Sequence, residues 1–151
     1  MRIALDTNVL AYAEGANGAG MRDKALDLIQ RLPQGAIVLP VQALGELFHV
    51  LVRKARRSPV LARAAVLSWR DAYPAAETSL EVMISATDLS ADNGLTIWDS
   101  VILSASAEAG CRLLLSEDLH AGFTWRGLTV TNPFGRVVHP LLQALLETDA
   151  G

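Results

Sequence analysis

The sequence predicts a single-domain α/β/α sandwich, in which helices cover both faces of a short, mainly parallel sheet. The chain has 151 residues, enough for one hydrophobic core but not for two. Its composition is 51% hydrophobic and only 5% aromatic, so aliphatic side chains fill the interior, as in helices packed on a small sheet. Strand-like apolar segments also alternate with helix-like segments, which implies right-handed crossovers between parallel strands.

The first half of the chain supplies two expected strands and four expected helices. Residues 2–5 read as a short apolar strand, and residues 7–13 turn directly into a helix. Helical spacing over residues 21–32 ends at Pro33, and residues 37–39 give the second strand. A helix with an apolar stripe starts at Val41. After the break at Ser58-Pro59, a further helix over residues 60–73 ends at Pro74.

The second half continues the alternation. We expect a brief strand near residues 76–78, and then a helix over residues 80–91 that opens with the capping-box pattern from Thr78 to Glu81 and stops at Asn93-Gly94. A helix over residues 96–109 is closed by Gly110, and residues 111–115 and 128–131 are apolar strands. The expected single domain covers residues 1–151, with a core over roughly residues 1–134 and an amphipathic C-terminal helix at about residues 140–147.

Bulk properties narrow the class of protein. A net charge of −3 argues against a protein that holds nucleic acid by overall charge, so a nucleic-acid role needs local chemistry. Cys111 is the only cysteine, which excludes an intramolecular disulfide and a zinc finger. The most apolar span, residues 36–52, is interrupted by polar residues, and the N-terminus lacks the features of a signal peptide. We therefore expect a cytoplasmic protein without a membrane anchor.

Four isolated carboxylates are the candidate chemical groups. Asp6 and Asp118 follow expected strands, so they lie at the carboxyl edge of the sheet, where ligands bind in α/β folds. Glu46 is the only acid between Asp27 and Asp71, and Asp99 opens an otherwise apolar helix. Carboxylates are costly to bury without a positive partner, and one divalent cation can serve several of them. The set therefore predicts a metal-dependent enzyme.

Each acid also has an ordinary structural explanation. Asp6 can cap the helix that follows it, and Asp99 can be the acid of a capping box opened by Thr96. Asp118 can be a turn residue. Glu46 can form an ion pair at helical spacing with His49 or Arg53. The functional interpretation therefore depends on the four acids as a set.

Several motifs in a fixed order give the chain a resemblance to PIN-domain ribonucleases, and specifically to VapC-type toxins of bacterial toxin-antitoxin pairs. The resemblance covers residues 2–134. Its motifs are Asp6-Thr7-Asn8-Val9-Leu10, Glu46, Trp98-Asp99, Leu115-Ser116-Glu117-Asp118-Leu119 and Asn132-Pro133-Phe134. One departure is Ser100, where the family often has a small apolar residue, and it does not threaten metal binding.

The resemblance implies a Mg²⁺ site, in which Mn²⁺ can substitute, and hydrolysis of RNA by metal-activated water. It assigns Asp6, Glu46, Asp99 and Asp118 as metal ligands and catalytic residues, with Asn8 and Ser116 as supporting polar groups. Hard oxygen ligands suit these metals, and His49, His120 and His139 are too scattered in sequence to suggest zinc. The resemblance also implies a homodimer that binds a cognate antitoxin.

A basic cluster near the middle of the chain is a candidate RNA contact. Arg53, Lys54, Arg56 and Arg57 hold four of the thirteen basic residues. Positive charge at the C-terminal end of a helix is also favoured by the helix dipole, so a solvated helix end explains the cluster equally well. The tryptophans Trp69, Trp98 and Trp125 can stack on bases, but isolated tryptophans in apolar segments are more often core residues.

Two other functions remain open at this point. A phosphatase of the haloacid dehalogenase type also has an aspartate after its first strand, but it needs a second aspartate where this chain has Asn8. A catalytically silent PIN-fold binding module would keep the fold without turnover, and the presence of all four acids argues against it. The sequence does not reveal which RNA is cleaved.

Overall fold

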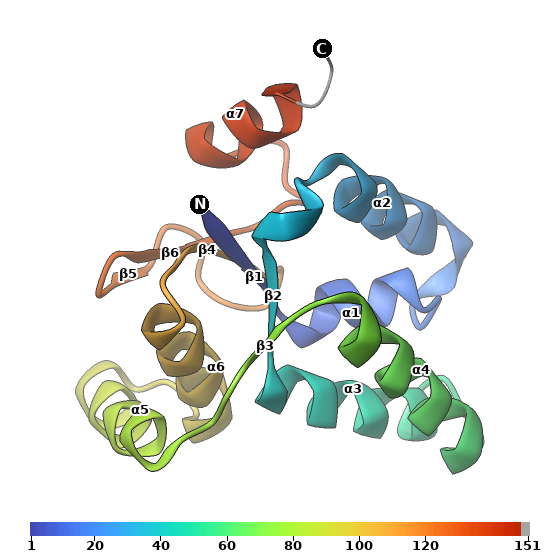
Figure 1. Ribbon diagram of the computed structural model, residues 1–151, viewed down its shortest axis with the longest axis horizontal. Helices are drawn as coiled ribbons and strands as arrows, with labels where there is room; N and C mark the ends of the chain where they lie inside the picture. Colours follow the sequence, from blue (N-terminus) through green and yellow to red (C-terminus); the bar gives the residue numbers. More distant parts are fainter. Residues whose placement is uncertain (149–151) are drawn as a thin grey trace.

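A six-stranded sheet forms the centre of the protein in the computed structural model, which describes residues 1–148 (Figure 1). Its strand order is β3-β2-β1-β4-β6-β5. All neighbours are parallel except β5, which forms an antiparallel hairpin with β6. The strands are β1 (Arg2–Leu5), β2 (Ile37–Pro40), β3 (Ala75–Ala76), β4 (Cys111–Leu115), β5 (Thr124–Trp125) and β6 (Leu128–Thr131).

The strand order reverses direction at β1, and this decides where a ligand can bind. The chain leaves β1 to build β2 and β3 on one side, and later returns to place β4 on the other side. Leu5 pairs with Leu115 in the register, so β1 and β4 end level with each other. The Asp6 amide continues the ladder by donating to the Leu115 carbonyl at 3.0 Å. Such a reversal leaves an open crevice at the carboxyl ends of the two strands.

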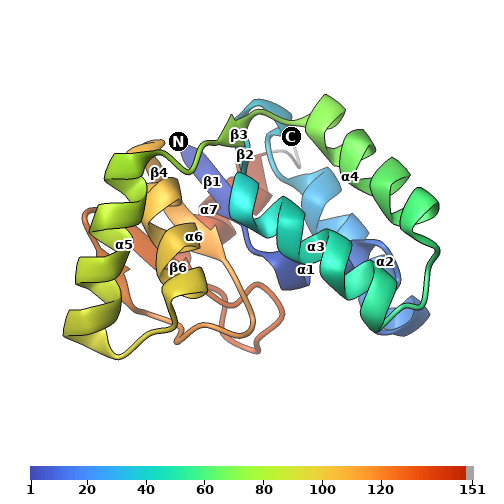
Figure 2. The same cartoon turned by 90° about the horizontal axis from the view of Figure 1, so that it is seen from below.

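Helices surround the sheet in two groups, which Figure 2 shows on opposite sides of the view. One group contains the first four α-helices, and the other pairs α5 with α6. The helices are α1 (Thr7–Ala13), α2 (Gly18–Arg31), α3 (Val41–Arg53), α4 (Pro59–Ala72), α5 (Leu80–Asn93), α6 (Ile97–Glu108) and α7 (Pro140–Thr148), with a 3₁₀ turn η1 (Gln34–Ala36). Within residues 1–148, no helix is both long and apolar enough to cross a membrane.

The core confirms the aliphatic composition seen in the sequence. Every residue of β1 after Arg2 is fully buried, and α6 is buried from Ser100 to Ser106 because α5 covers it on one side and the sheet on the other. The C-terminal helix α7 also joins this core, through the fully buried Leu142. The apolar stripe expected there therefore packs on the protein itself.

Local signals explain most helix boundaries. Ser58 caps α4 by accepting a hydrogen bond from the Leu61 amide, with Pro59 in the first turn as expected. Thr96 caps α6 by accepting from the Asp99 amide. Gly94 ends α5 with a left-handed φ of 68°, a conformation that glycine adopts without steric cost.

Several local expectations need correction. Helix α2 begins at Gly18 rather than at residue 21, and β3 lies at Ala75–Ala76 rather than at residues 76–78. The cap of α5 is Ser79 rather than Thr78, because the Ser79 hydroxyl reaches the Val82 amide. The short elements η1 and β5 were not expected. Trp98 is 54% exposed, so the core interpretation is wrong for this tryptophan.

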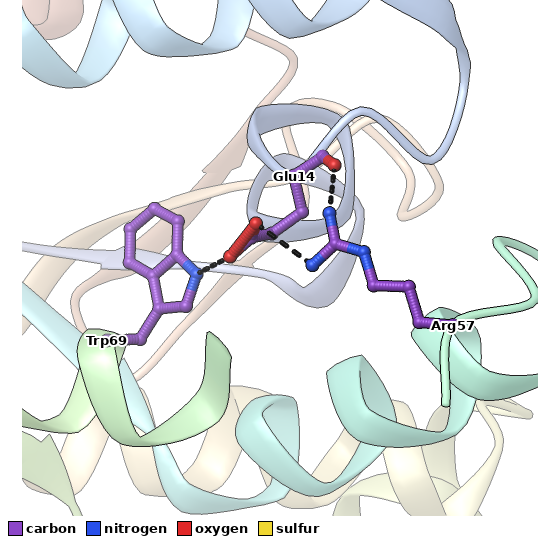
Figure 3. A network of polar contacts seen from close by, with 3 residues as sticks. All are labelled: Glu14, Arg57 and Trp69. Carbon is purple, nitrogen blue, oxygen red and sulfur yellow. Dashed lines mark hydrogen bonds and ion pairs between the residues drawn. The ribbon is translucent and has the colours of Figure 1, made fainter. Parts of the chain in front are cut away.

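A polar network joins the end of α1 to α4 (Figure 3). The Glu14 carboxylate accepts a hydrogen bond from Trp69 Nε1 at 3.1 Å and forms an ion pair with Arg57 Nη1 at 3.3 Å. Arg57 also donates to the Glu14 carbonyl oxygen. Both charged side chains are largely shielded from solvent, with exposures of 28% for Arg57 and 22% for Glu14. The network therefore ties α1 to the segment that leads into α4.

We predict that Glu14→Ala destabilises the fold, because it removes the acceptor of two shielded donors at once. The expected loss is about 1–3 kcal/mol of unfolding free energy, measured by urea denaturation. The matched control is Asp23→Ala, which removes an acid from an exposed ion pair with Arg22 and should cost less than about 1 kcal/mol. Equal losses in the two variants would contradict a structural role for the network.

Candidate functional site

A cleft of about 430 Å³ opens at the carboxyl edge of the sheet, where the strand order reverses. Helices α1 and α3 and the segments after β1 and β4 form its walls. All four acids predicted from the sequence line this one cleft, although more than a hundred positions separate the first from the last. They are Asp6, Glu46, Asp99 and Asp118.

Asp6 lies deepest, with only 4% of its surface exposed. It is the N-cap of α1, and its carboxylate accepts hydrogen bonds from the Thr7 amide and the Ser116 hydroxyl, both at 2.7 Å. The capping explanation is therefore correct, but it does not exclude a further role. Burial raises the Asp6 pKa to about 6, against the lowering effect of these two hydrogen bonds and together with repulsion from Asp99 and Glu46.

Glu46 faces the cleft from α3. Its Oε2 accepts a hydrogen bond from the Thr7 hydroxyl at 3.0 Å, so the first residue of α1 holds the carboxylate in place. The ion pair expected with His49 or Arg53 is not formed within the described residues. Partial burial raises the Glu46 pKa, and the charge of Asp99 raises it further, against the Thr7 hydrogen bond.

Asp99 enters the cleft from the first turn of α6, where it is half-buried. Its backbone amide donates to the Thr96 hydroxyl, so Thr96 caps α6, but the reciprocal hydrogen bond expected of a capping-box acid is not formed among the described residues. Its carboxylate, in contrast, has neither a hydrogen bond nor an ion pair in the part of the chain that the structure describes. Because its charge acts on both Asp6 and Glu46, these three carboxylates form one electrostatic group.

Asn8 fixes the segment that carries Asp118. Its Nδ2 donates to Asp118 Oδ2 at 3.2 Å and to the Ser116 hydroxyl oxygen at 3.3 Å, while its Oδ1 accepts from the Glu117 amide at 3.2 Å. Ser116 is fully buried and links this amide to Asp6. The two supporting polar groups predicted from the sequence therefore bind two of the four acids: Asn8 binds Asp118, and Ser116 binds Asp6.

Tyr12, one turn after Asn8, holds the same segment from the cleft wall. Its hydroxyl donates to Glu117 Oε1 at 2.8 Å, and its ring packs edge-on against Phe134 with centroids 5.5 Å apart. Partial burial, with the acceptor Glu117 and the charges of Glu117 and Asp118, raises the Tyr12 pKa to about 12. Sequence reasoning did not assign Tyr12 or Thr7. The available signal was their spacing from Asp6 and Asn8 along α1.

The chemistry of these donors fits a hard divalent cation. Asp6, Glu46, Asp99 and Asp118 offer carboxylate oxygens, and within residues 1–148 none of the four has a cationic partner. Among the same residues, however, no three His, Cys, Asp or Glu side chains already lie close enough together to hold a metal ion. Like charges repel, and a cation between the carboxylates would reduce that repulsion.

The four residues of the basic cluster have different environments in the structure. Lys54 lines the cleft together with His49, whereas Arg57 belongs to the network with Glu14 and Trp69. Arg53 and Arg56 are exposed and do not line the cleft. The structure therefore distinguishes four residues that the sequence presented as one group.

A sequence profile described as the PIN domain matches residues 3–121, so the chain belongs to the PIN domain family. The match contains Asp6, Glu46, Asp99 and Asp118. Comparison with curated protein sequences found no match.

Solved structures share the fold. VapC20 of Mycobacterium tuberculosis, described as a sarcin-ricin loop cleaving toxin, is 17% identical with a TM-score of 0.65, over 77% of this chain and 89% of that one. A toxin-antitoxin complex from Klebsiella pneumoniae is 17% identical with a TM-score of 0.65, and the match covers 87% of this chain and 98% of the other chain. FitAB bound to an IR36 DNA fragment is 15% identical with a TM-score of 0.69, and the match covers 91% of this chain and 99% of the other chain. These matches establish the α/β fold predicted from the sequence.

The buried Asp6 carboxyl predicts a measurable pH dependence of stability. Its pKa is about 6 in the folded protein and ordinarily 3.8, so between these values the folded state binds more protons than the unfolded state. The stability that Asp6 contributes is therefore greatest below its ordinary pKa of 3.8 and is lost as the pH rises toward about 6. Above that pH, Asp6→Asn should be more stable than the metal-free wild type by about 2–3 kcal/mol.

Urea denaturation in EDTA, between about pH 4 and pH 7.5, gives the difference in unfolding free energy between Asp6→Asn and wild type. Taking this difference removes the contribution of the carboxylates that do not interact with Asp6. A difference that stays constant over this range would show that burial does not raise the Asp6 pKa.

Proposed function

We propose that the protein is a Mg²⁺-dependent endoribonuclease, in which Mn²⁺ can replace Mg²⁺, and that it hydrolyses RNA phosphodiester bonds in the cleft. The observation that carries this proposal is the meeting of four carboxylates in one cleft, without any cationic partner among the described residues. Membership of the PIN domain family supports it. The haloacid dehalogenase alternative is set aside because the PIN domain profile matches residues 3–121, which is most of the chain.

The chain's own residues have distinct parts in this proposal. Asp6 is the fixed ligand, since two short hydrogen bonds orient its carboxylate. Asp99 has no partner to release before it approaches a cation, and Asn8 steers Asp118. Glu46, held by the Thr7 hydroxyl and with its pKa raised by partial burial, would act as the base that takes a proton from the attacking water. When bound, the metal ion would neutralise the carboxylates and lower the pKa of the attacking water.

We further propose that the protein is the toxin of a toxin-antitoxin pair, which acts in the cytoplasm as a homodimer and is held inactive by a cognate antitoxin. Two of the structurally similar assemblies carry descriptions that point this way, one as a toxin-antitoxin complex and one as VapBC bound to DNA. The experiment is co-expression with the product of the adjacent small open reading frame. A stable complex and suppression of RNA cleavage are expected, and free toxin that cleaves RNA equally well beside that product would contradict the pairing.

A catalytically silent binding module is the second candidate. It is favoured by one observation, that within the described residues the carboxylates are not yet close enough to form a metal site. Mn²⁺ titration by calorimetry separates the two candidates. The nuclease should bind Mn²⁺ and then cleave RNA, whereas a silent module should bind Mn²⁺ weakly or leave every RNA intact.

We predict that replacing any one of the four acids by its amide reduces RNA cleavage in Mg²⁺ by at least about 100-fold. The amide keeps the size of the side chain but removes the charge that holds the cation. Cleavage is followed as initial rates on a labelled single-stranded RNA, and EDTA should abolish it until Mn²⁺ is added back. The variants are Asp6→Asn, Glu46→Gln, Asp99→Asn and Asp118→Asn.

Asp88→Asn is the matched control, because Asp88 is an exposed acid on α5 outside the cleft. It should cleave RNA within about twofold of the wild-type rate, since surface changes of this kind have small effects. Wild-type rates in the Asp6, Asp99 and Asp118 variants together would exclude the proposed site.

A further inference from the structure

The acidic site is one end of a longer groove. On α3, the residues that line the cleft are Glu46, His49, Val50 and Lys54, which fall on one face of the helix and its C-terminal end. On the other wall, the lining runs from Asp6 along α1 to Asn17. At the rise of an α-helix, Lys54 lies about 12 Å along α3 from Glu46. The groove therefore has an acidic end and a basic end.

Lys54 is the only Lys or Arg that lines this groove within residues 1–148. Its backbone amide closes the end of α3 by donating to the Val50 carbonyl. Its ammonium group has no ion pair in the same part of the chain, although four carboxylates line the same cleft. The side chain is exposed, so it can meet a ligand without breaking an existing contact.

The neighbouring bases are not equivalent to Lys54. Arg57 forms an ion pair with Glu14. It lines a different pocket, together with Leu61 and Ser68. Arg53 precedes Lys54 directly but does not line the groove. A helix dipole would favour all of these charges alike, so it does not explain why only Lys54 among them lines the cleft.

The cleft wall also offers a surface that suits an unpaired base. Tyr12 lines the cleft close to Glu117 and Asp118, and aromatic side chains of this kind accept the faces of unpaired bases. The cleft volume of about 430 Å³ lies in the range of small-ligand sites.

We propose that Lys54 forms a second subsite, which holds a backbone phosphate of single-stranded RNA about two turns along α3 from Glu46, away from the phosphodiester at the acidic end. This inference rests on the proposed function, since it assigns a substrate contact to the same site. Lys54 positions the strand and takes no part in bond cleavage. A cation at this place also offsets the repulsion between RNA and a protein of net charge −3.

The test compares Lys54→Met with the matched control Arg53→Met, which removes the same charge from the adjacent residue. Affinity is measured by fluorescence anisotropy with a labelled single-stranded RNA in Mg²⁺, in an Asp99→Asn background that blocks turnover. Lys54→Met should weaken binding about tenfold, and Arg53→Met less than about twofold. The dependence of log affinity on log salt should flatten by about 0.7 for Lys54→Met, the value for one lost contact to a single strand.

Steady-state cleavage and further probes separate positioning from other roles. Lys54→Met alone should raise KM about tenfold with kcat within about twofold, and Lys54→Arg should restore most of the affinity. Single-stranded DNA should lose affinity in parallel with RNA, because the phosphate is shared, while duplex RNA should bind weakly to both forms. Urea denaturation checks that the fold is intact.

Three results would overturn the subsite. The first is an unchanged affinity and salt slope in Lys54→Met, and the second is an equal loss of affinity in Lys54→Met and Arg53→Met. The third is a fall in the kcat of Lys54→Met at constant KM. The last would mean that Lys54 acts on the acids and not on the strand. If the wild type binds RNA but never cleaves it, the proposed function fails, and the anisotropy results alone then decide the Lys54 subsite.

Discussion

The burial of the Asp6 carboxylate at the end of β1 is the constraint around which the site is arranged. At 4% exposure, this group must be satisfied by the protein, and the Ser116 hydroxyl and the Thr7 amide do so. Ser116 comes from the end of β4 and Thr7 opens α1, so satisfying one carboxylate fixes two segments that are far apart in sequence. The remaining acids are then placed relative to these segments.

A chain of hydrogen bonds extends this arrangement to the cleft walls. The Thr7 hydroxyl donates a hydrogen bond to Glu46. The Asn8 side-chain amide donates to both Ser116 and Asp118. Helix α1 therefore acts as the frame of the site, since consecutive residues of its first turn reach different neighbours. The Glu14 network fixes the far end of α1 against α4. Anchored at both ends, the helix can hold like charges near one another, which a mobile segment could not do.

Much of the fold was predictable because its signals are local. Apolar runs mark β1, β2, β4 and β6, and the stops at Pro33, Pro74 and Gly94 bound the helices correctly. The misplaced boundaries lie where no apolar period operates: the two-residue strands β3 and β5 exist only through pairing with β2 and β6. Trp98 was misplaced for a related reason, since an apolar side chain gives no sign of which way its helix faces.

The sequence by itself determined the candidate functional groups of this protein: the four acids, the polar groups Asn8 and Ser116, and the strand ends that carry Asp6 and Asp118. These follow from residue type and from periodicity, which are properties of short segments. Only the tertiary structure decided which groups meet, namely Thr7 with Glu46, Tyr12 with Glu117, and Arg57 with Glu14 rather than with the cleft. Such pairings join residues tens of positions apart, and their geometry depends on how the helices pack on the sheet.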